Sequence, residues 1–302
     1  MNKRLFALIC AVCLLSVMLG GYAFAEETTA ESDALPGESG TIPLLGRVDG
    51  EVIYTDIPIY VSGERMGFGY KVGAVTYVSL REFCDAIGLE NSTSWDQKTC
   101  TVRVRTDGLD LAVVVGSNYM TANGRCFYLQ NGVHNLNGVV IMPIRDLARC
   151  FGLDVTWNAS DWSAEVVVDK ITYLEQGDKY YNEDDLYWLS RIIYSEAGNQ
   201  GLDGMIGVGN VVLNRVEAPS CPDTIYDVIF DDRYGVQFHP TENGAIYEEP
   251  NELSVVAAKI CLEGYELVGD SLFFVNPEIG VTGWFASTRT YVATIGDHAF
   301  YA

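Results

Sequence analysis

The feature of this chain that most constrains its fold is an internal duplication in its first half. The segment Val78–Leu89 recurs 64 residues later as Met142–Leu153, and each copy is followed by a tryptophan and by alternating valines. Ser79 and Glu82 form an S-x-x-E capping box, which predicts the start of a helix. A glycine near the end of each copy indicates a helix that stops on a left-handed residue. The valine alternation predicts half-buried strands. We therefore expect two repeats, each a short helix followed by strands.

Composition sets the broad class of the protein. The chain has 302 residues, enough for about two domains of ordinary size. Its hydrophobic content of 48% excludes a disordered chain. Lys and Arg number 19 against 41 Asp and Glu, which gives a formal charge of −22. Because nucleic-acid binding requires basic surfaces, no nucleic-acid partner is expected.

The N-terminus predicts export. Lys3 and Arg4 precede an apolar run over residues 5–19, and Ala23-Phe24-Ala25 has the small-x-small form of a signal-peptidase site. Residues 1–25 are therefore interpreted as a signal peptide, with an uncleaved membrane anchor as the alternative. The acidic stretch 26–46 is poor in large apolar groups and predicts a flexible linker. The protein is expected to be secreted to the cell wall or another extracytoplasmic face.

Six cysteines follow the predicted signal peptide, and an exported protein permits them to form disulfides. Buried free thiols are the alternative. Among these six no C-x-x-C pair occurs, and the three histidines are scattered along the chain. Neither a metal site nor a cofactor is predicted.

One glutamate falls on the face of a predicted helix that is otherwise apolar and expected to be buried. Asn182 followed by three acidic residues predicts a helix start. Helical spacing then defines a buried stripe of Leu186, Leu189, Ile192 and Ile193. At 100° per residue Glu196 falls inside this stripe. Burial would raise its pKa, as a general acid near neutrality requires. The alternatives are that Glu196 extends past the helix end or pairs with Arg191 or Arg215.

A tight loop at 197–201 leads into a second predicted helix, which runs to about Val216. Its expected buried face comprises Met205, Val208, Val212, Leu213 and Val216. Glycines at 204, 207 and 209 weaken a helix by about 1 kcal/mol each relative to alanine, but they permit another helix or a substrate to approach closely.

The duplicated region, residues 47–170, resembles the copper amine oxidase N-terminal-like domain. The resemblance rests on the repeated Leu/Ile-Arg-acid, Gly-Leu and Ser/Thr-Trp elements and the alternating valines. It implies a scaffold or stalk that mediates cell-wall association. It does not imply copper, because the oxidase's cofactor tyrosine lies in Asn-Tyr-Asp/Glu, whereas Asn118-Tyr119 is followed here by Met120.

The region 180–302 resembles the SleB-type cell-wall hydrolases. The matching blocks are Leu189–Val216, Thr224–Phe230, Gln237-Phe-His-Pro, Asn243–Tyr247, Ser271–Pro277 and Ile295–Phe300. The resemblance implies a mainly helical, lysozyme-like catalytic domain with a small β-sheet. With the duplicated stalk domain, the expected fold class is α+β. The usual peptidoglycan-binding repeat of the family is replaced by the stalk, so a spore-cortex role and a vegetative role both stay open.

The same resemblance implies that peptidoglycan glycan strands are the substrate and that Glu196 is the catalytic residue. A lytic transglycosylase would use this single acid as proton donor and then as base, forming a 1,6-anhydro end. Asp203 as a water-activating base would instead give hydrolysis. A non-catalytic wall-binding or surface protein is the alternative of a different class.

Candidate sugar contacts have hydrogen-bonding or aromatic side chains. They are Gln237, Phe238, Tyr247, Asn276 and Trp284. Each of them has core packing or turn formation as an alternative role; Asn276-Pro277, for example, could simply end a strand.

Overall fold

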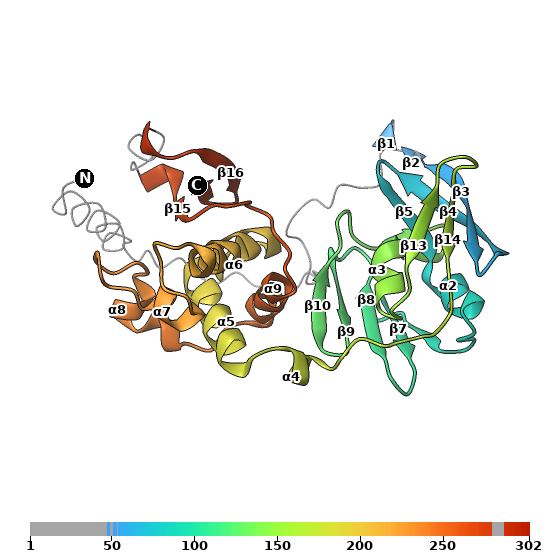
Figure 1. Ribbon diagram of the computed structural model, residues 1–302, viewed down its shortest axis with the longest axis horizontal. Helices are drawn as coiled ribbons and strands as arrows, with labels where there is room; N and C mark the ends of the chain where they lie inside the picture. Colours follow the sequence, from blue (N-terminus) through green and yellow to red (C-terminus); the bar gives the residue numbers. More distant parts are fainter. Residues whose placement is uncertain (1–46, 49–50, 53, 280–286) are drawn as a thin grey trace, which may run out of the picture. The chain divides into compact units, whose positions relative to one another are not determined.

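The structure, a computed structural model, describes residues 47–48, 51–52, 54–279 and 287–302. The predicted signal peptide, the linker 26–46 and Trp284 lie outside these residues. The described chain divides into two units, one that ends at Tyr181 and one that begins at Asn182 (Figure 1). The first is rich in strands and the second is mainly helical, so the α+β prediction is confirmed.

The first unit contains two large sheets. The seven-stranded sheet has the order β11-β12-β5-β4-β3-β14-β13, and its only parallel pair is β14 with β3. Its strands are β3 (Thr55–Val61), β4 (Glu64–Val72), β5 (Val75–Ser79), β11 (His134–Leu136), β12 (Val139–Pro143), β13 (Val155–Asn158) and β14 (Ser163–Val166). The five-stranded antiparallel sheet has the order β10-β9-β8-β7-β6. Its strands are β6 (Thr93–Asp96), β7 (Thr101–Arg105), β8 (Asp110–Val114), β9 (Tyr119–Ala122) and β10 (Arg125–Tyr128). The short strands β1 (Arg47–Val48) and β2 (Glu51–Val52) pair separately.

The two repeats have the predicted local structure. Helix α2 (Leu80–Ala86) begins at Ser79, whose hydroxyl accepts a hydrogen bond from the backbone N–H of Glu82 at 3.3 Å. Helix α3 (Ile144–Arg149) occupies the same place in the second copy. Gly88 and Gly152 follow these helices with φ of 82° and 65°, so both glycine predictions are confirmed.

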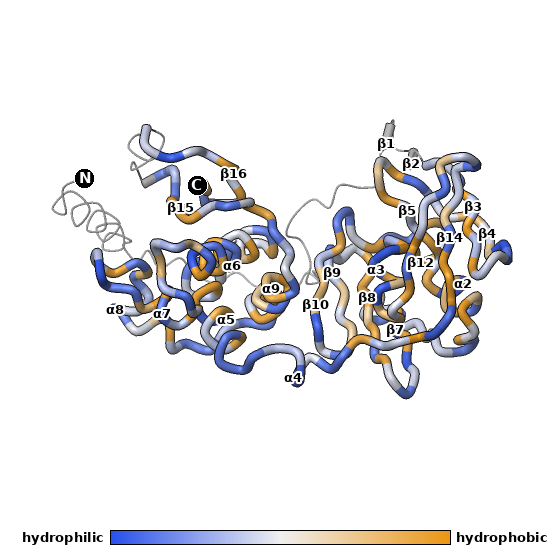
Figure 2. The backbone as a smooth tube through the Cα atoms, in the orientation of Figure 1, coloured by the Kyte–Doolittle hydropathy of each residue, from blue (hydrophilic) through white to orange (hydrophobic). Residues whose placement is uncertain are grey.

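The repeats pair with each other across β5 and β12. Met142 lies opposite Val78, its equivalent in the first copy, so the two copies meet about a local twofold relationship. Their following strands then separate, because β6 and β7 join the five-stranded sheet while β13 and β14 join the seven-stranded sheet. One core cluster includes Phe83 of α2, Leu147 of α3, Ile59 of one sheet and Val104 of the other. Figure 2 shows hydrophobic stretches along the strands and helices of this unit.

The first unit continues past residue 170, the predicted end of the stalk domain. The backbone N–H of Thr172 donates to the carbonyl of Phe151, and the Asn123 amide donates to the carbonyl of Leu174 at 2.7 Å. Helix α4 (Gly177–Tyr180) then lies against the same unit through the bond from Gly177 N–H to the carbonyl of Asn123. Residues 171–181 thus belong to the first unit.

The second unit is built on three packed helices, α5 (Glu183–Ala197), α6 (Leu202–Glu217) and α9 (Glu252–Leu262). Shorter helices α7 (Ile225–Ile229), α8 (Pro240–Asn243) and the 3-10 turn η1 (Ala245–Tyr247) connect them (Figure 1). The Asn182 side chain accepts hydrogen bonds from the N–H groups of Asp184 and Asp185, which confirms the predicted helix start. Helix α9 begins in the same way at Asn251.

Helix α6 is more deeply buried than its pattern predicted. Residues 204–212 are all buried, whereas Leu213 and Val216 of the predicted face are only partly so. The glycines explain the burial. A β-carbon on Gly209 would lie 2.7 Å from Cys261 Sγ, and one on Gly207 would lie 2.6 Å from the ring of Phe300. The close approach that these glycines permit is therefore made to α6 by neighbouring elements of the fold.

A small antiparallel sheet completes the second unit, with the order β15 (Phe273–Val275), β17 (His298–Tyr301), β16 (Tyr291–Ile295). Gly296 turns the chain between β16 and β17 with φ of 55°. After β15, the Asn276 side chain accepts a hydrogen bond from the N–H of Glu278, at the start of the 3-10 turn η2 (Pro277–Ile279).

The six cysteines that follow the predicted signal peptide are free thiols, and Cys84, Cys126, Cys150 and Cys261 are buried. The free-thiol alternative therefore describes this structure. Within the described part of the chain, no helix has the length and apolar character needed to cross a membrane.

Candidate active site

The last turn of α5 carries Glu196 next to the packed interior of the helical unit. Leu189, Ile192 and Ile193 are fully buried, while Leu186 at the start of the stripe is partly exposed. Glu196 is partly buried and is followed by fully buried Ala197. The helix periodicity thus placed the glutamate correctly beside the apolar stripe.

Burial raises the pKa of Glu196 from its ordinary 4.5 to about 7. The positive charge of Arg215 acts in the opposite direction and lowers this pKa. At neutral pH the carboxyl is therefore distributed between its protonated and ionised forms. A group in this state can donate a proton and accept one.

Arg215 reaches the site from α6 and is itself buried. Its Nε donates a hydrogen bond of 2.8 Å to the carbonyl of Leu272, and its guanidinium lies 5.0 Å from the ring centroid of Phe238 and 5.5 Å from that of Phe273. Arg191, the other basic partner considered from the sequence, instead forms an ion pair with Glu249 at 2.8 Å. Of the two arginines, Arg215 is the one whose charge acts on the pKa of Glu196.

The turn η1 is attached to α5 directly beside Glu196. The hydroxyl of Ser195 donates hydrogen bonds to the carbonyl oxygens of Arg191 at 2.8 Å and Ala245 at 3.2 Å. Tyr247, at the end of η1, is 61% exposed, and its ring centroid lies 6.3 Å from that of Trp188. The segment thus joins the glutamate to an aromatic surface.

That surface, here called the aromatic cluster, comprises Tyr187, Trp188, Tyr226, Phe230 and Tyr247. Trp188 lies at its centre, 5.2 Å from the ring centroids of both Tyr226 and Phe230. The three tyrosines are at least 41% exposed. Trp188 and Glu196 belong to one helix and are separated by about 12 Å along its axis at 1.5 Å per residue. Sequence reasoning included Tyr247 but missed the other four rings, which come from α5 and from α7 with its C-cap residue Phe230.

The remaining predicted sugar contacts occupy different environments. Phe238 is only 2% exposed and packs beneath Arg215, so it is a core residue and offers no face to a sugar. Asn276 forms the turn bond to Glu278, the alternative considered from the sequence. Gln237 is partly buried, and its amide donates to the carbonyl of Gly235 at 2.7 Å. Trp284 lies outside the described residues.

Asp203, the candidate second acid, lies in the first turn of α6. Burial raises the pKa of Tyr265, which follows α9, and the charge of Asp203 adds to this rise. The charge that affects the pKa of Glu196 is that of Arg215. Among the described residues, no group of three or more His, Cys, Asp or Glu side chains is arranged to hold a metal ion.

Comparison with known proteins identifies the families that this chain resembles. A sequence profile described as cell wall hydrolase matches residues 199–301, and one described as copper amine oxidase N-terminal domain matches residues 47–166. Both resemblances inferred from the sequence are confirmed. The cell wall hydrolase CwlJ of Oceanobacillus iheyensis is 30% identical over 130 residues, which cover 89% of that protein and 40% of this chain. This chain belongs to the cell wall hydrolase family.

Longer relatives also match part of this chain. The spore cortex-lytic enzymes of Oceanobacillus iheyensis and Bacillus cereus are each 32% identical to it over 120 residues, or 40% of this chain. The chain spans 42% and 45% of their respective lengths. Among solved structures, the catalytic domain of the germination-specific lytic transglycosylase SleB from Bacillus anthracis matches at 30% identity with a TM-score of 0.37, covering 43% of this chain and 100% of that domain.

Proposed function

We propose that this protein cleaves the glycan strands of peptidoglycan outside the cytoplasm, with Glu196 as the proton donor. The observation that carries the proposal is the partly buried carboxyl of Glu196, whose pKa is raised by burial to about 7. Membership of the cell wall hydrolase family supports peptidoglycan as the substrate. The printed names of the relatives also support action on a wall or a spore cortex.

The reaction proposed is lytic transglycosylation of the β-1,4 bond between N-acetylmuramic acid and N-acetylglucosamine. Protonated Glu196 gives its proton to the bridging oxygen as the bond from that oxygen to C1 of the muramoyl residue breaks. The resulting carboxylate then accepts the proton of the muramoyl 6-hydroxyl as this oxygen attacks C1. The products are a free 4-hydroxyl and a 1,6-anhydro-muramoyl end, and Glu196 regains its proton.

The proposed reaction uses a single carboxyl. Hydrolytic glycosidases place two carboxyl groups about 5 to 9.5 Å apart. The charge that acts on the pKa of Glu196 is the cation Arg215, which lowers this pKa. Hydrolysis with Asp203 as a water-activating base is the alternative reaction, and it would give reducing ends in place of anhydro ends.

The aromatic cluster supports a binding role for the surface beside Glu196. Exposed tyrosine rings and the partly exposed ring of Trp188 present apolar faces together with polar tips, which suits the C–H faces and hydroxyls of sugars. The strand is proposed to run from Glu196 over η1 to Tyr247 and Trp188. Tyr247 retains its proposed role in substrate binding, whereas Phe238 acts by supporting Arg215.

The test is incubation of the purified protein with peptidoglycan sacculi, followed by turbidity measurement and mass spectrometry of the released fragments. We expect turbidity loss and anhydro ends, which are lighter by one water than the reducing ends of hydrolysis. Glu196→Gln should abolish both signals. Release of reducing ends would show that the reaction is hydrolysis and not transglycosylation. Equal turbidity loss by wild type and Glu196→Gln would refute Glu196 as the acid, and sacculus binding without any cleavage would favour a non-catalytic wall protein.

A further inference from the structure

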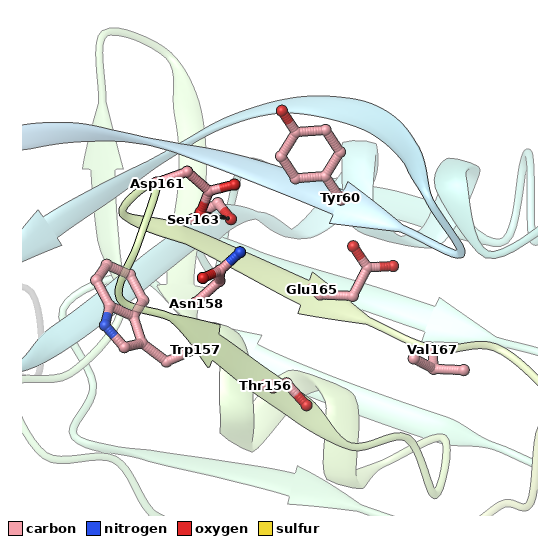
Figure 3. A pocket seen from close by; sticks show the side chains of 8 residues that line it. All are labelled: Tyr60, Thr156, Trp157, Asn158, Asp161, Ser163, Glu165 and Val167. Carbon is pink, nitrogen blue, oxygen red and sulfur yellow. Dashed lines mark hydrogen bonds between the residues drawn. The ribbon is translucent and has the colours of Figure 1, made fainter.

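Two surfaces of the chain combine aromatic and acidic side chains, and only one of them lets the two act together. The groove on β3, β13 and β14 of the first unit is lined by residues that include Trp157 and Glu165 (Figure 3). Glu165 lies opposite Thr156 in the register of β13 and β14, so the indole and the carboxylate project from opposite faces of the sheet. The ammonium of Lys71 also covers the Trp157 ring, 5.2 Å from its centroid. This groove therefore separates its aromatic ring from its charge.

The aromatic cluster of the second unit is bordered by five exposed carboxylates, here called the acidic rim. They are Glu183, Asp184, Asp227, Glu248 and Glu249. Two belong to α5 and stand four residues before Tyr187 and Trp188, which places each acid and ring on one face of the helix. One follows Tyr226 in α7, and two follow Tyr247. Each exposed tyrosine of the cluster thus has a carboxylate among its nearest neighbours along the chain.

One arginine of the chain shows how such a ring and carboxylate hold a cation. The guanidinium of Arg191 lies 3.7 Å from the ring centroid of Tyr187, and its Nη2 donates to Glu249 at 2.8 Å. This arginine is only 8% exposed, so it is part of the folded interior. Tyr226 and Tyr247 contact other aromatic rings of the cluster but carry no stacked lysine or arginine within the described part of the chain. Their exposed rings are therefore open to a ligand.

The rest of the second unit offers little exposed positive charge to offset the rim. From residue 182 onward the sequence has nineteen Asp and Glu but only five Lys and Arg. Four of these five basic side chains are buried or partly buried. The exposed one, Arg233, forms an ion pair with Asp231 at 2.8 Å. The unit would therefore repel a polyanion, including a glycan strand whose stem peptides keep free carboxylates.

A protonated amino sugar suits this surface better than a neutral or an anionic sugar. The C–H face of a sugar ring can stack on an exposed tyrosine ring. An ammonium group on the same sugar is also attracted by the ring faces and by the carboxylates around them. An N-acetylated sugar keeps the stacking but lacks both attractions. Because the cluster shares α5 with Glu196, the arrangement favours a sugar within a glycan strand over a cationic peptide.

We propose that the aromatic cluster and its acidic rim select glycan strands that contain glucosamine with a free, protonated amino group. The sugar stacks on the exposed ring of Tyr247, and its ammonium is attracted by the rings of the cluster and by the rim. De-N-acetylated strands are thus the preferred substrate. The inference rests on the proposed function, because it assigns a substrate preference to the surface beside Glu196.

The binding test uses the full protein carrying Glu196→Gln, so that no ligand is cleaved. Isothermal titration compares a glucosamine tetramer with an N-acetylglucosamine tetramer, which differ only in their N-acetyl groups. At low salt we expect the glucosamine tetramer to bind about fivefold more tightly, as one exposed cation–π contact supplies. Sodium chloride should reduce this ratio, since salt screens exposed charges. Equal or weaker binding of the glucosamine tetramer overturns the proposal.

Matched pairs of substitutions distinguish the rim from the general negative charge of the protein. Glu183→Gln with Glu248→Gln removes two charges of the rim. Glu266→Gln with Asp270→Asn removes two exposed charges that lie outside it, after α9. The first pair should reduce the preference for the glucosamine tetramer at least about twofold, and the second should leave it unchanged. An equal reduction by both pairs would show unspecific attraction and overturn the site.

A second set of measurements tests the aromatic contact and the need for a sugar. Tyr247→Phe should keep the preference, whereas Tyr247→Leu should lose it, because leucine offers apolar surface without a π face. An unchanged preference in Tyr247→Leu contradicts the proposed contact. Tetralysine carries the charge without the sugar rings and should bind more weakly than the glucosamine tetramer. Equal binding of tetralysine, with the same dependence on the rim, would make this a site for cationic peptides and overturn the proposal.

Kinetics with the wild-type protein separate this inference from the proposed function. Glycan strands freed of stem peptides are compared before de-N-acetylation, after it, and after re-acetylation. We expect kcat/KM to rise about fivefold on de-N-acetylation and to return to its first value on re-acetylation. Cleavage without such a change leaves the proposed function intact and overturns the preference. A binding preference without cleavage of any strand overturns the proposed function and retains the binding site for the amino sugar.

Discussion

Ser195 and Ala245, fifty residues apart in sequence, are joined by a hydrogen bond of 3.2 Å from the serine hydroxyl to the alanine carbonyl. The bond attaches η1 to the last turn of α5, one residue before Glu196. Because η1 also carries Tyr247, the contact fixes the proposed proton donor relative to the exposed aromatic cluster. The proposed acid and the proposed binding surface are thus held by the same two elements.

The first prediction concerns Tyr247. Tyr247→Ala should raise KM for glycan strands several-fold with little change in kcat, because it removes a stacking surface remote from the broken bond. The side chain is 61% exposed, so the free energy of unfolding should change by no more than about 0.5 kcal/mol. Steady-state kinetics on soluble glycan strands measure both parameters. Tyr247→Phe, which keeps the ring, is the control, and a kcat loss as large as that of Glu196→Gln would contradict a binding role.

The pH dependence of activity should follow the protonated fraction of Glu196. The pKa of this carboxyl is about 7, so its acid form predominates below that pH. We expect kcat to decrease as the pH rises above about 7, with a limb that reports one ionisation. Initial rates of turbidity loss between pH 5 and 9 provide the check, and a limb near 4.5 would show that the carboxyl ionises as it does in solvent.

Stability should change with pH in the same direction. The folded-state pKa of Glu196 lies above the unfolded value of 4.5, so its contribution to stability is complete below 4.5 and is lost as the pH rises to about 7. The full difference corresponds to about 3 kcal/mol. Glu196→Gln, which cannot ionise, should be more stable than wild type above pH 7 by up to about this amount. Denaturant unfolding at pH 4.5 and pH 8 tests this, and a variant that gains nothing at pH 8 argues against a buried acid.

Arg215 should determine the pH at which activity falls on the alkaline side of the pH profile. Its charge lowers the pKa of Glu196, so Arg215→Met should raise that pKa and extend activity to higher pH. The same change removes the bond to the Leu272 carbonyl and should lower the free energy of unfolding by about 1 to 3 kcal/mol. Arg215→Lys keeps the charge and serves as the control. If the pH profile of Arg215→Met were identical to that of wild type, the guanidinium would not act on the pKa of Glu196.

Packing between α5, α6 and α9 should depend on Gly209. An alanine β-carbon there would lie 2.7 Å from Cys261 Sγ and 2.9 Å from Ile193 Cδ1. Overpacking costs about 1 to 3 kcal/mol and exceeds the gain in helix propensity of about 1 kcal/mol, so Gly209→Ala should destabilise the unit. Gly204→Ala meets only the side chain of Gln200, at 3.0 Å, and should be neutral or stabilising. Thermal unfolding of both variants compares them, and equal midpoints would contradict the close packing.

Thiol accessibility provides a test of the free cysteines. Burial raises the pKa of Cys84 and Cys150 to about 12, and Cys261 is also buried. Among the cysteines of the described residues, only exposed Cys100 and partly exposed Cys221 should react with a thiol reagent in the folded protein at pH 8. Peptide mapping after labelling identifies the sites. Labelling after unfolding without reductant should add Cys84, Cys126, Cys150 and Cys261, and a failure of these four to react would indicate disulfides.

The amino-acid sequence by itself determined the local features of this protein. The start of α5 at Asn182, the capping of α2 by Ser79 and the left-handed glycines each depend on residues within one or two turns, so their patterns were sufficient. The apolar period also placed Glu196 beside the buried stripe. Only the tertiary structure decided that Arg215 acts on Glu196 and that Phe238 is buried beneath it. It likewise decided which rings gather around Trp188. These relationships join segments distant in sequence, and they follow from the packing of whole helices and strands, which no local pattern specifies.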